Sequence, residues 1–242
     1  MKKFIGILIA CCASLSSYSQ ILASVETTAA SIVPTAASID FREKKYPEAD
    51  SYVLGLKKKY DDVRELSRDL TAPFKTDEDK VRAIYIWICN NIAYDIKEAR
   101  NELLASRMEA MRFPAYKYFS TYFADEVLER KKGTCAGYAQ LFYELCTRAD
   151  IKCEIVPGYA SQNESVIRFL RKTNLYNSDH AWNKVKLNGE FYYVDLTWSS
   201  GTVFRNKFSR HLNLDYYLVP VDQLYPTHAE GDFTISCRDV GN

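Results

Sequence analysis

The stretch Gly133-Thr134-Cys135-Ala136-Gly137-Tyr138 decides the fold class, because it places a thiol at the start of an apolar helical pattern. A helix is predicted over 135–150. In the first turn of a helix, the helix dipole and the unpaired backbone N–H groups stabilise a thiolate and can donate to a developing oxyanion. Cys135 is therefore a candidate nucleophile. The predicted buried face of this helix consists of Tyr138, Leu141, Phe142, Leu145 and Cys146.

A β-hairpin is predicted downstream, where 181–187 and 190–196 flank Asn188-Gly189. Asn-Gly is the strongest two-residue hairpin signal, because both turn positions need positive φ. The turn pairs Leu187 with Glu190, and the register continues to Trp182 opposite Asp195 and His180 opposite Thr197.

The same register makes His180 and Asp195 diagonal neighbours on one face of the hairpin, which they share with Trp182 and Thr197. Diagonal Cβ atoms lie about 7 Å apart or less, so the Asp195 carboxylate is predicted to reach the His180 imidazole.

Cys135, His180 and Asp195 are, in this chain order, the parts of an activated cysteine nucleophile. Each residue alone has a plainer interpretation: a buried cysteine, a hydrogen-bonded sheet histidine and a solvated carboxylate. The predicted His–Asp contact favours the catalytic interpretation over these three.

The remaining pattern is helical before Cys135 and mostly extended after it, which indicates an α+β fold. The most regular helix starts at the cap Thr76 and carries one apolar stripe from Val81 to Ile92. Other helices are predicted over 46–70, 97–111 and 124–131, and strands over 152–159 and 212–219. Residues 161–178 are predicted to be a long loop or a helical insertion.

The first residues have the pattern of an export signal, with Lys2 and Lys3 before an apolar run and small residues before Gln20. We expect a signal peptide over 1–19, a flexible stalk over 20–40 and a single domain over 41–242 with its core at 75–200. The expected location is periplasmic, cell-surface or secreted. The alternative is a lipoprotein, and membrane anchoring is expected only if Cys11 is lipidated.

Charge and cysteine content limit the function classes further. Removing 1–19 takes away two of the 32 basic residues and none of the 31 acidic ones, so the mature chain is almost neutral and has no electrostatic footprint for nucleic acid. Five cysteines then remain, and an odd count in an oxidising compartment indicates a free thiol. The sequence predicts neither a specific disulfide nor an oligomeric state.

The motif around Cys135, together with His180-Ala181-Trp182-Asn183 and Asp195-Leu196-Thr197-Trp198, resembles the bacterial transglutaminase-like branch of the papain-like cysteine enzymes. The upstream stretch 83–95 resembles the helix that precedes the nucleophile there. The resemblance implies a nucleophile helix packed on an antiparallel sheet, with additional helices at the N-terminal side. It also implies that Cys135 attacks an amide, that His180 transfers the proton and that Asp195 orients His180.

The resemblance assigns Trp182 and Trp198 to the walls of a substrate site. Animal transglutaminases use an upstream Trp as an oxyanion donor, but no Trp lies between Trp87 and Cys135, and Tyr94 is the candidate substitute. No calcium-site loop and no zinc-ligand spacing is found, so neither a metal nor a cofactor is expected. The two other histidines, His211 and His228, receive no role.

We therefore expect an exported cysteine acyl-transfer enzyme that acts on peptide or protein amides. Hydrolysis is favoured over cross-linking, because one domain of this size lacks the extra modules of animal transglutaminases. The alternative is a non-enzymatic surface module that keeps the fold and binds peptide or glycan.

Overall fold

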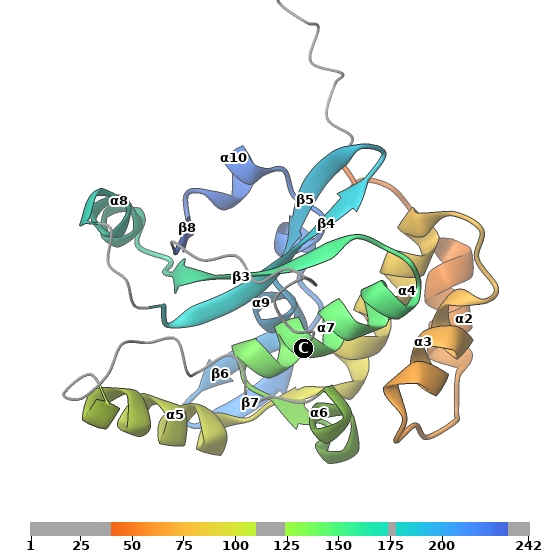
Figure 1. Ribbon diagram of the computed structural model, residues 1–242, viewed down its shortest axis with the longest axis horizontal. Helices are drawn as coiled ribbons and strands as arrows, with labels where there is room; N and C mark the ends of the chain where they lie inside the picture. The colour runs from red at the N-terminus through yellow and green to blue at the C-terminus, as the bar shows by residue number, and fades with distance from the viewer. Residues whose placement is uncertain (1–39, 110–123, 174–177, 232–242) are drawn as a thin grey trace, which may run out of the picture. The chain divides into compact units, whose positions relative to one another are not determined.

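The protein is described by a computed structural model that covers residues 40–109, 124–173 and 178–231 (Figure 1). The export signal predicted over 1–19, with Cys11, lies outside the described residues, as do Cys237 and all of the predicted stalk except Asp40. Within the described part of the chain, no helix has both the length and the apolar character needed to cross a membrane.

The described part of the chain begins with the helices α2 (Pro47–Gly55), α3 (Val63–Thr71) and α4 (Asp77–Asn91). The prediction of one helix over 46–70 is wrong, because α2 ends at Gly55 and Asp62 caps a new helix by accepting from the Glu65 N–H at 2.9 Å. The prediction for α4 is confirmed, since the Thr76 hydroxyl accepts from the Asp79 N–H at 3.1 Å.

Two short strands connect the end of α4 to the nucleophile region. Strand β1 (Ala93–Tyr94) pairs in parallel with β2 (Lys132–Gly133), and Tyr94 lies opposite Gly133. This pairing places Tyr94 beside Gly133, which lies two residues before Cys135 in the chain. The helices α5 (Ile96–Glu109) and α6 (Ala124–Arg130) lie between these strands in the chain and agree with the predictions over 97–111 and 124–131.

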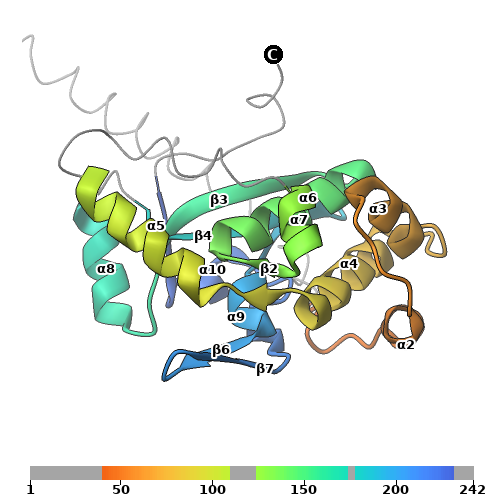
Figure 2. The same cartoon turned by 90° about the horizontal axis from the view of Figure 1, so that it is seen from below.

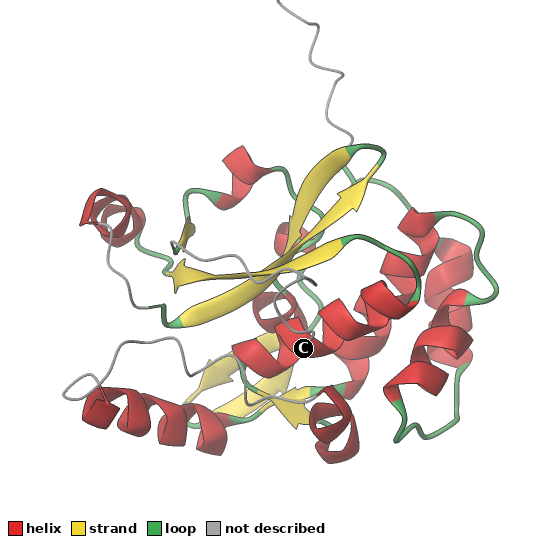
Figure 3. Cartoon of the chain, viewed as in Figure 1, coloured by secondary structure: helices red, strands yellow, loops and turns green. Residues whose placement is uncertain are grey.

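A four-stranded antiparallel sheet has the order β5-β4-β3-β8 (Figure 3). Its strands are β3 (Cys153–Ala160), β4 (His180–Leu187), β5 (Glu190–Val194) and β8 (His228–Glu230). The predicted hairpin is confirmed in its register and turn, because Leu187 pairs with Glu190 and both Asn188 and Gly189 have positive φ, 52° and 90°.

The far end of the predicted hairpin differs from the structure. Strand β5 stops at Val194, and Asp195 becomes the N-cap of the helix α9 (Leu196–Ser200). The pairs predicted from the register beyond this point, Trp182 with Asp195 and His180 with Thr197, therefore do not form as strand pairs. The chain leaves the sheet here because the Asp195 side chain accepts the Trp198 N–H and starts the helix.

The C-terminal part is less regular than predicted. It contains the hairpin β6 (Gly201–Phe204) and β7 (Lys207–Arg210), the 3₁₀ turn η2 (Leu214–Tyr216) and the short helix α10 (Val221–Leu224). The prediction of a strand over 212–219 is wrong, because the Asn213 side chain accepts the Asp215 N–H and turns the chain. Only a single bridge between Tyr193 and Val219 joins this stretch to β5.

The helix α7 (Cys135–Arg148) packs against β3 and β4 and is flanked by α3, α4 and α6 (Figures 1 and 2). Odd-numbered residues of β4 face this helix, and the Asn183 amide donates to the Ala139 carbonyl at 3.0 Å. Trp182 belongs to a second buried cluster with Val156, Tyr193, Val219 and Leu224. The observed fold is the predicted α+β class, with the helix that starts at Cys135 packed on an antiparallel sheet.

The segment over 161–178 contains α8 (Glu164–Thr173), so its helical alternative is the correct one for the described residues. This helix packs on β8 and β3 at the edge of the sheet. The close approach of β8 and Trp182 to β3 depends on Gly158, because a Cβ there would lie 2.2 Å from the Ala229 carbonyl oxygen and 2.5 Å from Trp182 Cη2.

Gly158→Ala is expected to lower the free energy of unfolding by about 1–3 kcal/mol, because the added methyl group overpacks the junction of β3, β8 and Trp182. Urea unfolding followed by circular dichroism measures the change. Gly55→Ala is the matched control, since a Cβ at that helical position meets nothing within 4 Å. Equal stability of the two variants would contradict the tight packing at Gly158.

Candidate active site

The carboxylate of Asp195 is the centre of the site and is completely buried. Its Oδ1 accepts the Trp198 backbone N–H at 3.1 Å. Its Oδ2 lies 2.7 Å from His180 Nε2 and 3.1 Å from His228 Nε2. The position of Asp195 follows from its role as a helix cap, which turns the carboxylate under the sheet and toward both imidazoles.

His180 is the first residue of β4 and lies opposite Gly158 of β3. The predicted contact between His180 and Asp195 is present, although helix capping rather than continued strand pairing produces it. Since Nε2 faces Asp195, Nδ1 is the ring nitrogen left for the Cys135 thiol. Trp182 stacks on His180 with ring centroids 5.9 Å apart, so it supports the imidazole from the buried side.

Cys135 is half-buried at the first position of α7, whereas the other described cysteines, Cys89, Cys146 and Cys153, are buried and free. The Cys135 side chain is a hydrogen-bond and charge partner of His180. Thr134 occupies the N-cap, but its hydroxyl donates to Glu102 at 3.2 Å and makes no bond to the helix. No side-chain cap from Thr134 therefore covers the first-turn N–H groups of α7, which face the nucleophile end.

The electrostatics of the His–Asp pair favour the ion pair. Burial would lower the pKa of His180, but the charge of Asp195, and then the contacts with Asp195 and Cys135, raise it well above the ordinary value. Burial would raise the pKa of Asp195, but the charge of His180 and the hydrogen bonds from His180 and His228 hold it well below the ordinary value. The imidazolium–carboxylate form is the stable state near neutral pH.

His228 is the site residue that sequence reasoning missed. It is 1% exposed, and its ring lies 4.9 Å from both the Trp182 and the Trp198 rings, measured between centroids. Only the pairing of β8 with β3, which places His228 opposite Ala160, brings it to Asp195. The only sequence signal was that the chain has just three histidines. His211, the third, is exposed and lines the neighbouring cleft.

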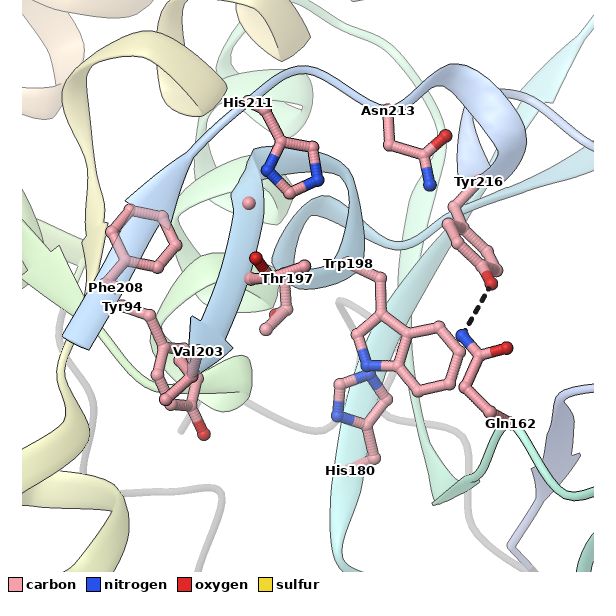
Figure 4. A pocket seen from close by; sticks show the side chains of 12 residues that line it. Tyr94, Gln162, His180, Thr197, Trp198, Val203, Phe208, His211, Asn213 and Tyr216 are labelled. Atoms are coloured by element: carbon pink, nitrogen blue, oxygen red, sulfur yellow. Dashed lines mark hydrogen bonds between the residues drawn. The ribbon is translucent and has the colours of Figure 1, made fainter. Parts of the chain in front are cut away.

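A cleft of about 410 Å³ opens beside His180 (Figure 4). The Gln162 amide donates to the Tyr216 hydroxyl at 3.2 Å on one side of it, and Tyr94, Val203 and Phe208 lie together on the other. Trp198 and Tyr94 line the cleft, whereas Trp182 and Cys135 do not. Cys135 nevertheless lies near the cleft, because Tyr94, which lines it, pairs with Gly133, two residues before Cys135.

His180, Asp195 and His228 also form a set of metal-ligand atoms that all lie within 4.8 Å of one another. Sequence spacing did not reveal this set, because the three residues come from separate strands and a helix cap. The two histidine–carboxylate hydrogen bonds account for the cluster without an ion.

The fold and this arrangement of groups define a papain-like α+β architecture. Residues 64–196 match the transglutaminase-like superfamily, and this chain belongs to that superfamily. The match spans Cys135, His180 and Asp195 and ends before His228.

Among curated proteins, the chain is 36% identical over 159 residues to the human kyphoscoliosis peptidase and 35% identical over 161 residues to the mouse protein. Each alignment covers 64% of this chain and 21% of the relative, so the chain spans about a fifth of their length. Cytokinesis protein 3 of Schizosaccharomyces pombe is 23% identical over 155 residues.

Solved structures that are similar to this chain include the following two. A structure of a TGase has a TM-score of 0.39 and 15% identity, with 80% of this chain and 41% of that chain covered. A candidate cysteine protease from Cytophaga hutchinsonii has a TM-score of 0.43 and 16% identity, with 84% and 52% covered.

Asp195→Asn is expected to destabilise the fold by about 3–5 kcal/mol near pH 5, because it leaves the buried His180 charge without its partner. The raised pKa of His180 stabilises the fold fully below 6.5, and this contribution is lost as pH rises through the raised value. Because the pKa of Asp195 is lowered, its carboxylate stabilises the fold fully above pH 3.8, and this stabilisation is lost as the pH falls through the lowered pKa. The difference from the wild type should therefore be largest between these values and shrink at alkaline pH, as His180 loses its charge.

Urea unfolding near pH 5 and at alkaline pH measures this difference in the free energy of unfolding. Asn keeps a carbonyl acceptor for the Trp198 N–H, so loss of the cap does not explain the result. Asp215→Asn, at an exposed carboxylate, is the control. A difference that stays constant with pH would show that the buried pair is not ionised.

Proposed function

We propose that this protein is a cysteine acyl-transfer enzyme that acts on peptide or protein amides through Cys135, His180 and Asp195, with hydrolysis as its main reaction. The observation that carries the proposal is the 2.7 Å contact between His180 Nε2 and Asp195 Oδ2, with the Cys135 side chain near enough to the same imidazole to help raise its pKa. This is the order of groups that activates a thiol nucleophile.

The mechanism uses only these groups and water. In the resting enzyme the proton of Cys135 is already on His180 Nδ1, so a thiolate lies beside the imidazolium and attacks the amide carbonyl carbon. The tetrahedral oxyanion is stabilised by the first-turn N–H groups of α7. As the C–N bond breaks, the His180 imidazolium protonates the leaving amine, and a thioester remains on Cys135. Water then attacks the thioester, the neutral His180 accepts a proton from it, the carboxylic acid leaves, and the thiolate–imidazolium pair is restored.

The choice of hydrolysis rests on the relatives. The two proteins that are about 35% identical to this chain are named peptidases. If an amine instead of water enters the thioester step, the same groups form a new amide. The acceptor therefore decides between proteolysis and cross-linking, and no other change in the mechanism is needed.

The cleft indicates which substrates fit. Among the residues that the structure describes, its lining contains neither Asp, Glu, Lys nor Arg, and it is rich in aromatic rings. The Thr197 hydroxyl is buried there without a hydrogen-bond partner among the described residues. A neutral side chain with an apolar surface and one polar group satisfies this lining, whereas a charged one would be desolvated without a partner.

Iodoacetamide is expected to label Cys135 rapidly near neutral pH and to leave the buried Cys89, Cys146 and Cys153 unlabelled. Peptide mass spectrometry locates the label. His180→Ala should abolish the rapid phase, because the imidazole no longer accepts the thiol proton. His211→Ala, at an exposed histidine of the same cleft, is the control. Slow labelling of Cys135 in the wild type would favour a non-enzymatic binding module.

Cys135→Ala is expected to lower kcat for a casein-like substrate by more than about 10³-fold, because the thioester cannot form. Release of new amino termini and incorporation of a labelled amine are measured in parallel. Amine incorporation that exceeds hydrolysis would overturn the preference for hydrolysis. If Cys135→Ala still forms both products at the wild-type rate, the assignment as an enzyme that acts through Cys135 is wrong.

Phe208→Ala is expected to raise KM for peptides with a neutral aromatic side chain about tenfold while kcat stays nearly constant, because it removes cleft wall far from the reacting atoms. Phe204→Ala is the control, since Phe204 lies on the same hairpin, is 69% exposed and does not line the cleft. Steady-state kinetics with neutral and charged peptides measure both effects. A preference for charged peptides would refute this account of the cleft.

A further inference from the structure

His228 contacts the same carboxylate oxygen as His180, although it lies outside residues 64–196 that match the superfamily. Its Nε2 is 3.1 Å from Asp195 Oδ2, and its Nδ1 is 2.8 Å from the Thr227 hydroxyl. A chain of polar groups therefore runs from Thr227 through His228 and Asp195 to His180. The mechanism above does not use its first two members.

The direction of these hydrogen bonds follows from the chemistry of the groups. An ionised carboxylate only accepts, so His228 Nε2 must carry a hydrogen to bond Asp195. A neutral ring then has an unprotonated Nδ1, which accepts the Thr227 hydroxyl hydrogen at 2.8 Å in preference to the more distant Leu224 carbonyl at 3.2 Å. Burial, and then the charges of His180 and Arg171, lower the pKa of His228 despite the opposing effect of Asp195. The neutral Nε2–H form is thus consistent with its surroundings.

The His228 ring is held from several sides. The backbone carbonyl oxygen of His228 accepts a hydrogen bond from Arg171 Nη2 of α8 at 2.6 Å, and β8, which contains His228, pairs with β3. The rings of Trp182, Trp198 and Tyr216 lie 4.9, 4.9 and 5.8 Å from it. Because its backbone and ring are both fixed, its N–H arrives at Asp195 in one orientation.

We propose that His228 is a positioning residue, which holds the Asp195 carboxylate ionised and in the rotation that directs Oδ2 at His180. The inference rests on the proposed function for its effect on catalysis. The physical reason is that Oδ1 is fixed by the Trp198 N–H, while two donors share Oδ2. Without His228, only the imidazole that moves protons during the reaction would hold Oδ2.

Two variants separate the hydrogen bond from the packing of the ring. His228→Phe keeps an aromatic ring but has no N–H, whereas His228→Gln can place an amide N–H near the position of Nε2. His228→Phe is expected to lower kcat about 10- to 100-fold with little change in KM, and His228→Gln to restore most of it. The acid limb of Cys135 alkylation is the fall of its rate on acidification. The pH of this fall should rise by about one unit in His228→Phe and stay unchanged in His228→Gln.

A structural role alone would lower activity in proportion to lost stability, so urea unfolding is measured for both variants. Equal activity losses in His228→Phe and His228→Gln, or an unmoved acid limb, would overturn the proposal. If His228→Phe does not fold, Thr227→Val provides the test, because it removes the Nδ1 partner and leaves the ring. It should shift the acid limb in the same direction, and an unchanged limb would overturn the proposal.

Nitrogen NMR of the three ¹⁵N-labelled histidines gives a readout that needs no substrate. His228 is expected to be the neutral Nε2–H tautomer near neutral pH, while His180 is doubly protonated. His228 protonated only on Nδ1 would overturn the proposal. If this tautomer is found but the wild type turns over no amide, the proposed function fails and the positioning of Asp195 stands.

Discussion

The structure depends on one buried charge, the carboxylate of Asp195. An ionised carboxylate in the protein interior is very unfavourable unless hydrogen bonds and an opposite charge compensate it. Here one oxygen accepts a helix N–H and the other faces two imidazoles. These contacts make Asp195 at once a helix cap and the partner of His180, so local folding and site chemistry are set by the same side chain.

Several features of the fold serve this carboxylate. The strand β5 ends at Val194 so that α9 can begin beneath the sheet. Gly158 lets β8 and Trp182 approach β3 closely, which brings His228 to Asp195 from the opposite edge of the sheet. The β1–β2 pair fixes Tyr94 beside the start of α7. The site is therefore assembled on strands and helix ends rather than on free loops, as precise positioning requires.

The cleft and the reacting groups make separate contributions. The buried side, with Trp182 and His228, fixes the protonation and direction of His180. The open side, with Trp198, Tyr94 and Phe208, has no Asp, Glu, Lys or Arg among its described lining residues and offers contacts to a neutral chain. His180 belongs to both sides, which is why a change in substrate contacts need not disturb the ion pair with Asp195.

The sequence by itself determined the helix that begins at Cys135, the Asn188-Gly189 turn and the contact of His180 with Asp195, because each depends on local periodicity, turn chemistry or short-range register. It also determined the superfamily, through motifs around the same residues. Only the tertiary structure decided that Asp195 caps a helix, that Trp182 lies behind His180 and that His228 shares the carboxylate. The contact of His228 with Asp195 depends on the pairing of β8 with β3, which joins distant segments through only three residues of β8 and which no local pattern encodes.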